Sequence, residues 1–291
     1  MPAISCHSCR RLISDQEDNC PFCNAPQRLE RRSSRLSQQA FGDPNAVIGW
    51  IVGVNVLLYI ASILLNPDSA LSMEQGLLGI GSPDSKALYL LGMTGGPAWL
   101  CGHYWTLITA SFLHGSLLHI FFNLSWLRQL GAITVHFLGP GRFVIIYVLT
   151  GIGGFLLSNV WNTSPIGPSP TIGASCSIFG LLGVLAAFSK RRGGVIGLNL
   201  NRQIWAWTIV GLAFGFLIPM INNAGHIGGL ITGYILGYIL PKQEGTRESG
   251  VLQLSALIIL GISLLCFVWN GWIMLEIFDH LELTGQFFCR R

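Results

Sequence analysis

The sequence of 291 residues carries little charge, and its acidic residues are missing from the entire middle of the chain. Asp, Glu, Lys and Arg together make up 10% of the residues, whereas a soluble domain carries about 25%. None of the 13 Asp and Glu residues lies between Asp84 and Glu244, and hydrophobic residues reach 51%. This composition excludes an ordinary water-soluble globule and predicts a protein built mostly for lipid.

The missing carboxylates also limit the chemistry available in the middle of the chain. An aspartyl protease within the membrane and a carboxylate-based proton transporter both need Asp or Glu there, and residues 85–243 contain neither. The pattern H-E-x-x-H is absent, so a zinc-dependent intramembrane protease is excluded. No internal repeat or inverted symmetry of helix spacing is visible, which disfavours a secondary transporter. Ser, His and Asn are the reactive polar groups that remain.

Apolar stretches of about 20 residues, the length that crosses ~30 Å of hydrocarbon, recur along the chain. Residues 67–104 are too interrupted for a spanning helix, and their aromatic residues suit the membrane interface. The polar, cysteine-rich N-terminus does not resemble a cleavable signal peptide, so we expect the first apolar helix to direct insertion. The apolar stretches predict seven membrane helices, at about 46–66, 105–130, 143–161, 175–189, 203–221, 226–240 and 252–275.

Basic residues predict how these helices are oriented. With the N-terminus in the cytoplasm, 14 of the 17 Lys and Arg residues fall on the cytoplasmic side, and only Lys86, Arg290 and Arg291 fall outside. Positively charged loops stay in the cytoplasm, so we expect a multi-pass integral protein of the cell (inner) membrane. Residues 28–45 form a basic linker, which we expect to orient the chain and to contact anionic lipid rather than nucleic acid.

Four cysteines near the N-terminus form two C-x2-C pairs, Cys6 with Cys9 and Cys20 with Cys23. Two such pairs supply four thiolates at the spacing of a tetrahedral zinc site, and a reducing compartment disfavours disulfides among them. We predict a structural zinc ribbon over residues 1–27, with an iron or iron–sulfur site as the alternative. All four ligand positions come from the protein, so we expect no catalytic role. The ribbon can also bind a cytoplasmic partner, which the sequence does not identify.

Two polar residues open predicted helices in the acid-free region. Ser175 stands where a helix N-terminus presents unpaired backbone N–H groups and partial positive charge. Taken alone, such a serine is most often an N-cap. His226 precedes glycines at four-residue spacing, Gly229, Gly233 and Gly237, which allow another helix to approach closely. A histidine at this depth is a functional candidate, although it can also serve only as a hydrogen-bond partner between helices.

Ser175 and His226 are expected at the same depth in the membrane. Ser175 lies 15 residues before Lys190, and His226 lies 16 residues before Lys242. At about 1.5 Å per residue, both lie ~22–24 Å from the cytoplasmic boundary, on helices that run in the same direction. We therefore expect the two side chains to meet below the outer surface of the membrane.

The second predicted helix carries a third polar group, formed by His114, His119 and Asn123. His119 and Asn123 are four residues apart, which places them on one face of a helix. Both side chains can donate hydrogen bonds toward a developing oxyanion. His114 lies nearer the outer end, where it either supports the oxyanion side or is only a helix-terminal polar residue.

The segments HGSLLHIFFN, GASCSIFGLLG and GHIGGLITG, in this order, together resemble the rhomboid family of intramembrane serine proteases. The resemblance spans about residues 105–240. It implies an all-α polytopic membrane fold with a six-helix core, here placed within residues 46–250. Residues 251–291 add a seventh transmembrane helix and an outer tail, which we expect to flank the core and to carry no chemistry.

The same resemblance implies a role for each polar residue. Ser175 is implied as the nucleophile and His226 as the general base. The oxyanion hole is implied to consist of the Ser175 backbone N–H with the side chains of His119 and Asn123, supported by His114. Because residues 85–243 contain no carboxylate, no acidic third residue is available to complete a triad. We therefore expect a Ser–His dyad that needs no cofactor for catalysis.

Two positions depart from the family pattern. Cys176 follows the implied nucleophile where glycine is usual, and its small side chain is expected to fit. Trp105-Thr106 stands where the family commonly has a Trp-Arg pair, so we expect the first outer loop to be held differently. Cys101 and Cys289 are both predicted on the outer side, where a disulfide between them can form.

These features predict an intramembrane serine endopeptidase whose partners are transmembrane protein substrates and membrane lipid, and not nucleic acid. Substrate segments with helix-destabilising and small residues are expected, because an intact helix keeps its carbonyls in hydrogen bonds. One alternative is a catalytically inactive rhomboid-like protein that binds membrane segments. The other is a metal or small-solute transporter that uses His114, His119 and His226 as ligands.

Overall fold

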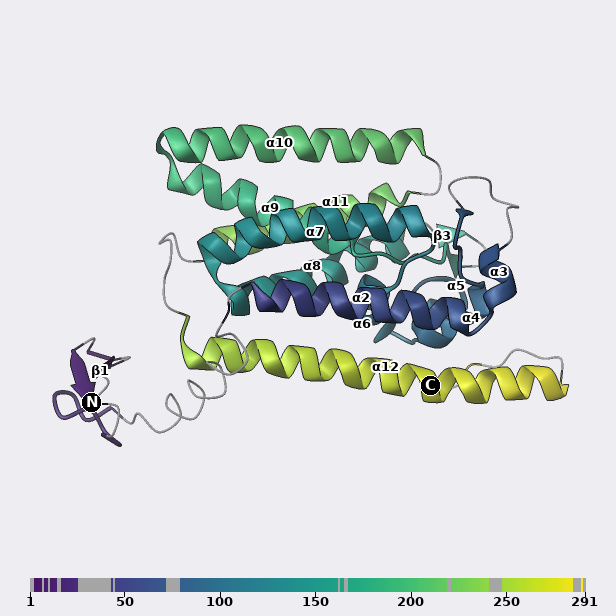
Figure 1. Ribbon diagram of the computed structural model, residues 1–291, viewed down its shortest axis with the longest axis horizontal. Helices are drawn as coiled ribbons and strands as arrows, with labels where there is room; N and C mark the ends of the chain where they lie inside the picture. Colours follow the sequence, from purple (N-terminus) through teal and green to yellow (C-terminus); the bar gives the residue numbers. More distant parts are fainter. Residues whose placement is uncertain are drawn as a thin grey trace.

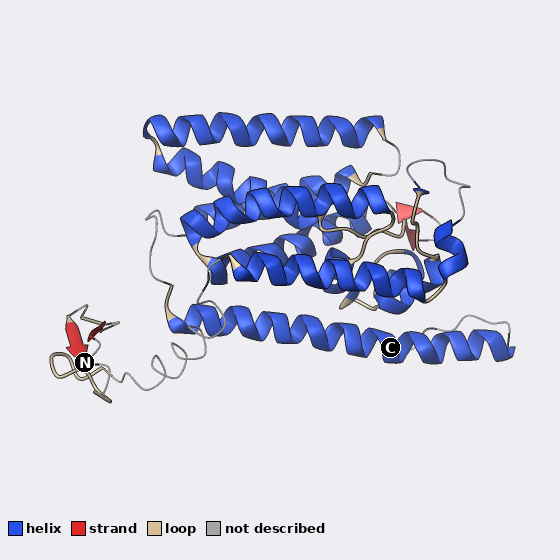
Figure 2. Cartoon of the chain, in the orientation of Figure 1, coloured by secondary structure: helices blue, strands red, loops and turns tan. Residues whose placement is uncertain are grey.

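Helices make up nearly all of the regular structure (Figures 1 and 2). The computed structural model describes residues 3–6, 8–9, 11–14, 17–25, 43, 45–71, 79–161, 163–164, 167–218, 221–240, 248–284 and 289. Most of the predicted basic linker, together with Lys242, Arg290 and Arg291, lies outside these described residues. The orientation predicted from the basic residues therefore stays a prediction.

Seven described helices have 17 residues or more, and they confirm the predicted polytopic helical membrane fold. Taken singly, α2, α8 and α12 are long and apolar enough to cross a membrane, and a bent pair that includes α7 would be a fourth span. The seven helices are α2 (Ala46–Leu64), α7 (Leu117–Leu138), α8 (Pro140–Trp161), α9 (Ser175–Arg192), α10 (Gly194–Leu217), α11 (Asn223–Ile239) and α12 (Gly250–Thr284).

The second membrane helix was predicted over residues 105–130, and this prediction is wrong. A short helix α6 (Thr106–Thr109) continues into a 3-10 turn, η2 (Ala110–Phe112), and the chain then bends by 93° before α7 begins. The helix restarts at α7 because the Ser116 hydroxyl accepts a hydrogen bond from the His119 N–H at 3.3 Å, which caps its N-terminus. His114 therefore lies in the break, and not on the second helix as predicted.

Residues 79–116, which we call the connecting segment, hold only short helices. Besides α6, these are α4 (Ser85–Leu91) and α5 (Gly96–Leu100), and α3 (Pro67–Leu71) lies just after α2. Within the described part of residues 67–104 no helix reaches a spanning length, as predicted. Two short antiparallel pairs complete the structure. β1 (Ala3–Ser5) pairs with β2 (Leu12–Ser14), and β3 (Thr163–Ser164) pairs with β4 (Gly167–Pro168) shortly before α9.

Helix α9 lies at the centre of the bundle, and every residue from 176 to 189 is buried. In Figure 1, α10 and α12 lie on opposite sides of the group formed by α2, α7, α8, α9 and α11. The glycine stripe of α11 faces α9. A Cβ on Gly229 would meet the carbonyl oxygen of Cys176, and one on Gly233 would meet that of Gly180. The close approach expected at these glycines is confirmed, and the helix that approaches is α9.

Candidate functional site

Ser175 is the first residue of α9, one position after the N-cap residue Ala174. Its side chain is half-buried, and in the described part of the chain its hydroxyl makes no hydrogen bond. Ser175 is therefore not the N-cap of α9. Residues 169–174, which we call the nucleophile loop, lead into it. Gly173 in this loop has φ +129°, a conformation that side-chain-bearing residues rarely adopt.

The nucleophile loop is held by the connecting segment through two backbone hydrogen bonds. The Thr171 N–H donates to the Thr94 carbonyl at 2.9 Å, and the Gly173 N–H donates to the Ala110 carbonyl at 2.9 Å. Thr94 and Thr171 also form a β-bridge. The backbone that presents Ser175 therefore takes its shape partly from residues 94–110, far away in the sequence.

His226 lies in the first turn of α11, and its ring is 6% exposed. It stacks on the ring of Phe179 with the centroids 4.2 Å apart and an angle of 12° between the planes. Phe179 comes four residues after Ser175, on the same face of α9. Beside this stack, the space for a Cβ on Gly225 lies 2.8 Å from the Cys176 Sγ. These contacts bring Ser175 and His226 to the same level of two packed helices.

The hydrogen bonding of Ser175 and His226 is incomplete in this state. Among the described residues, no hydrogen bond joins the two side chains, and the buried Nδ1 of His226 has no partner. In enzymes without substrate such bonds are often long or misaligned, and they tighten when substrate binds. The arrangement thus places a serine and a histidine at the same level of two packed helices, without a formed hydrogen bond between them.

The His119 ring lies against Gly173, two residues before Ser175. Its Nδ1 accepts a hydrogen bond from the Gly115 N–H at 3.2 Å, so in the neutral ring the proton sits on Nε2. A Cβ on Gly173 would lie 2.7 Å from this Nε2 and 3.7 Å from the Ser175 Oγ. Because residue 173 is glycine, the His119 ring can approach the backbone this closely. The His119 Nε2–H donor and the Ser175 hydroxyl therefore both lie beside Gly173.

Asn123 and His114 both contact His119, but in different ways. One amide hydrogen of Asn123 donates to the His119 carbonyl at 2.8 Å, so the second remains for another acceptor. The His114 ring packs edge-to-face on His119 with centroids 5.0 Å apart. It is 1% exposed, and neither of its nitrogens has a partner in the described part of the chain. Its observed contact is therefore a packing contact.

Asn222 is a polar residue at the start of α11 to which sequence analysis gave no role. Its side chain accepts a hydrogen bond from the Gly225 N–H at 3.0 Å and so caps the helix that carries His226. Its amide donates to the hydroxyls of Ser158 on α8 and Thr171 in the nucleophile loop. The turn that carries His226 is thereby fixed to the loop that carries Ser175.

A groove with a volume of about 570 Å³ borders these residues. Thr171 of the nucleophile loop and Asn222 line it directly, and Ala224 and Ile227 flank His226 in the sequence. Trp161 and Phe216 add large, exposed apolar side chains. A volume of this size suits a ligand of several residues in length.

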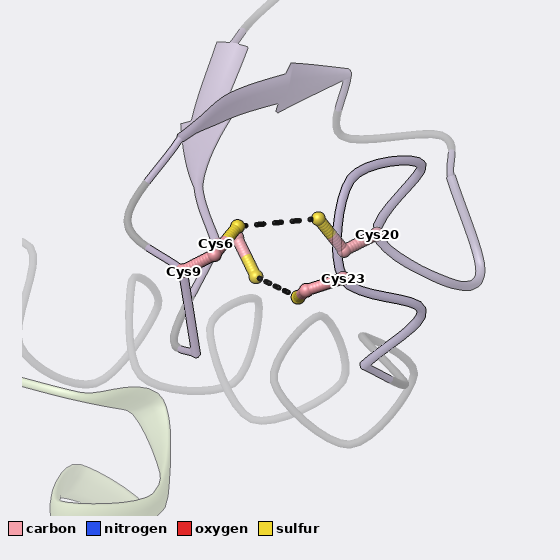
Figure 3. Close-up of side chains that lie close together, drawn as sticks. All are labelled: Cys6, Cys9, Cys20 and Cys23. Carbon is pink, nitrogen blue, oxygen red and sulfur yellow. Dashed lines mark hydrogen bonds between the residues drawn. The ribbon is translucent and has the colours of Figure 1, made fainter.

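The four N-terminal cysteines form a separate cluster whose sulfur atoms face one another (Figure 3). All four Sγ atoms lie within 4.8 Å, with Cys6 to Cys23 and Cys9 to Cys20 both at 3.6 Å. Zn–S bonds of 2.3 Å in a tetrahedron place sulfurs about 3.8 Å apart. Hydrogen bonds, first from the backbone of Cys9, lower the pKa of Cys6 to about 6. The cluster therefore has the geometry to hold one metal ion.

The disulfide suggested by the predicted topology is present, since Cys101 and Cys289 are bonded with their Cα atoms 5.0 Å apart. Cys176 is buried and packs against Gly154 and Gly225, as expected for a small apolar residue.

Phe179 was not predicted as a site residue because a phenylalanine on an apolar helix resembles an ordinary core residue. Its spacing of four residues from Ser175 was the signal available.

Comparison with known proteins identifies the same region. Residues 101–243 match the Rhomboid family, described as the Rhomboid domain. "Rhomboid protease GluP" of Bacillus subtilis (strain 168) is 35% identical over 64% of this chain, and the chain spans 36% of that relative's length. YdcA, a second Bacillus subtilis (strain 168) protein named for the same family, is 30% identical over 50% of this chain and 72% of its own length. "Rhomboid-like protease 3" of Toxoplasma gondii is 28% identical over 65% of this chain and 67% of its own length.

Proposed function

Because this chain belongs to the rhomboid family, we propose that it is an intramembrane serine endopeptidase that cleaves transmembrane-segment substrates with a Ser–His dyad. The observation that carries the proposal is the packing of the His119 Nε2 against Gly173, beside the Ser175 hydroxyl. A peptide carbonyl bound between this nitrogen and the hydroxyl would have a nucleophile at its carbon and a donor at its oxygen.

In the proposed mechanism, the Ser175 Oγ attacks the substrate carbonyl carbon while His226 takes the hydroxyl proton. The oxyanion that forms accepts hydrogen bonds from the Ser175 backbone N–H, the His119 Nε2–H and the free amide hydrogen of Asn123. His226 then gives its proton to the leaving amine, which leaves an acyl-enzyme. Water attacks this ester with His226 again as the base. Phe179 keeps the His226 ring in its plane during both proton transfers, because the two rings stack.

The test combines labelling by a fluorophosphonate probe with cleavage of a model transmembrane substrate by the purified protein in liposomes. We expect the probe to label Ser175, and Ser175→Ala to abolish both labelling and cleavage. His226→Ala should slow both reactions by several orders of magnitude. Ser125→Ala is the matched control, because the Ser125 hydroxyl is exposed and bonds only the Phe121 carbonyl of its own helix. Cleavage that survives in Ser175→Ala would refute the proposal.

The rival function is a rhomboid-like protein that binds membrane segments without cutting them. It is favoured by the missing hydrogen bond between Ser175 and His226 among the described residues. This rival predicts a folded protein that binds the model substrate, with neither probe labelling nor product. The same experiment therefore separates the two functions.

We also propose that the N-terminus is cytoplasmic and that the groove beside the active site opens to the opposite side. The excess of Lys and Arg on one side supports this orientation. A reporter enzyme active only outside the cytoplasm, fused after Arg291, should be active, whereas a fusion before Met1 should not. The reverse pattern would overturn the proposed orientation. Water would then reach the site from the cytoplasmic side.

For the cysteine cluster we propose a structural zinc ion held by Cys6, Cys9, Cys20 and Cys23. The sulfur separations suit tetrahedral zinc, and a filled set of four thiolates leaves no open position for catalysis. Metal analysis of the purified chain should give one zinc per molecule, and Cys20→Ser should lower this content. Probe labelling of Ser175 should remain in that variant. Iron in place of zinc would contradict the assignment.

A further inference from the structure

Helix α12 carries a fully buried amide, Asn270, which is 0% exposed. It lies next to the buried apolar residues Ile273, Met274 and Ile277 of the same helix, whereas residues 251–269 are mostly not buried. An amide in hydrocarbon is costly unless its hydrogen bonds are made within the protein. Asn270 therefore marks a position at which α12 has a specific polar partner.

All three hydrogen bonds that Asn270 makes among the described residues go to the connecting segment. Its amide nitrogen donates to the carbonyls of Tyr89 at 3.0 Å and Leu90 at 2.8 Å. Its amide oxygen accepts from the indole N–H of Trp105 at 3.1 Å. One side chain thus joins the end of α4 to the start of α6, two points that are 15 residues apart.

Apolar contacts hold α12 against the same segment without help from Asn270. Phe267 packs edge-to-face on Phe112 at 5.9 Å, and Trp269 packs on Trp105 at 6.3 Å. Such contacts can bind a helix, but they tolerate small shifts because they are not directional. The three hydrogen bonds of Asn270 fix the position of the backbone, which apolar packing alone does not.

The part of the connecting segment that Asn270 fixes is the part that holds the nucleophile loop. Between Leu90 and Trp105 lies Thr94, whose carbonyl accepts from the Thr171 N–H, and η2 after Trp105 contains Ala110, whose carbonyl accepts from the Gly173 N–H. The Thr94 hydroxyl lies 3.1 Å from that of Thr106, next to Trp105. A shift of the segment would therefore move both anchors of the loop that presents Ser175.

We propose that Asn270 is a positioning residue for catalysis, which acts from the seventh helix through the connecting segment on the nucleophile loop. The inference rests on the proposed protease function and assigns α12 a role in it, against the expectation that this helix only flanks the core.

The test compares Asn270→Leu with two matched variants. Leucine keeps the branching at Cγ, favours insertion of α12 into lipid, and removes all three hydrogen bonds. Ser263→Ala is the control on the same helix, because the buried Ser263 hydroxyl donates only to the Ile259 carbonyl of α12 itself. Trp105→Phe removes one donor and keeps an aromatic ring. Each protein is assayed for kcat and KM on the model substrate and for amide hydrogen exchange over residues 169–174.

In Asn270→Leu we expect kcat to fall by roughly tenfold or more, because a shift of the nucleophile loop misplaces Ser175 relative to the substrate carbonyl. KM should change by less than about twofold, and the Thr171 and Gly173 amides should exchange faster. Trp105→Phe should show part of this effect, and the double variant should be no slower than Asn270→Leu alone. Ser263→Ala should match the wild type.

The inference is overturned if Asn270→Leu leaves both kcat and the exchange of Thr171 and Gly173 unchanged. It is also overturned if kcat falls without faster exchange in the nucleophile loop. If the wild-type protein is neither labelled nor active, the proposed function fails instead. In that case the exchange comparison still decides whether Asn270 holds the loop.

Discussion

Substitution of Gly173 by alanine tests the proposed oxyanion space directly. The new Cβ would lie 2.7 Å from the His119 Nε2, 2.9 Å from its Cε1 and 3.7 Å from the Ser175 Oγ. The first two separations are shorter than side-chain carbons normally show, so the His119 ring must move or the loop must shift. Either change removes a donor from the developing oxyanion. Loss of one such donor costs about 10²- to 10³-fold in kcat.

The same substitution also strains the backbone, because Gly173 has φ +129°. Forcing an alanine into a left-handed conformation costs about 1–2 kcal/mol, so a lower thermal midpoint is expected as well. Gly193→Ala separates the two effects. Gly193 has φ +68° but nothing within 4 Å of its Cβ position, so this variant should lose stability and keep its kcat.

The assay is the initial rate of cleavage of the model transmembrane substrate in liposomes, with the thermal midpoint measured in parallel. Fluorophosphonate labelling of Ser175 should slow together with cleavage. If folded Gly173→Ala cleaves within about threefold of the wild-type rate, the oxyanion is not stabilised in the space beside His119. The mechanism would then need a different set of donors.

Three further substitutions test the frame around the site. Phe179→Ala should lower kcat by up to about tenfold, because a stacked ring pair is worth about 0.5–1.5 kcal/mol, whereas Phe179→Tyr should keep most of the rate. Glu248→Gln should lower the free energy of unfolding by about 1 kcal/mol, measured by thermal denaturation, because this carboxylate accepts two backbone N–H bonds at the start of α8. An unchanged midpoint would contradict that role. Gly229→Ala should lower the yield of folded protein, because its Cβ would meet the α9 backbone, while Gly261→Ala has open space and should be tolerated.

Hydropathy located the helices because each spanning helix needs a long apolar run, and this requirement is local. It failed at the second helix, where residues 106–138 are mostly apolar and the break at 113–116 depends on the Ser116 cap. It also placed the start of α10 near residue 203, whereas the helix begins at Gly194. Polar residues at a membrane boundary reduce hydropathy without ending a helix.

The candidate site was predictable where a residue type is rare in its surroundings. A serine, two histidines and an asparagine stand out against an apolar, acid-free background. Phe179 and Gly173 do not stand out, because one looks like core and the other like a turn. Their importance comes from a ring stacked on His226 and from the close approach of His119 to a residue without a Cβ. Asn270 was passed over since its partners lie more than 160 residues away in the sequence.

The complete burial of α9 has a consequence for how the protein responds to its membrane. Residues 176–189 touch protein on all sides, so lipid chains meet the outer helices and not the helix that carries Ser175. A thicker or thinner bilayer is therefore accommodated by tilt or local deformation around α2, α10 and α12. A substrate helix, which has no such shield, must adjust its own depth. Bilayer thickness would then select which peptide bond of a substrate arrives at Ser175, while the serine itself stays at a height fixed by the protein.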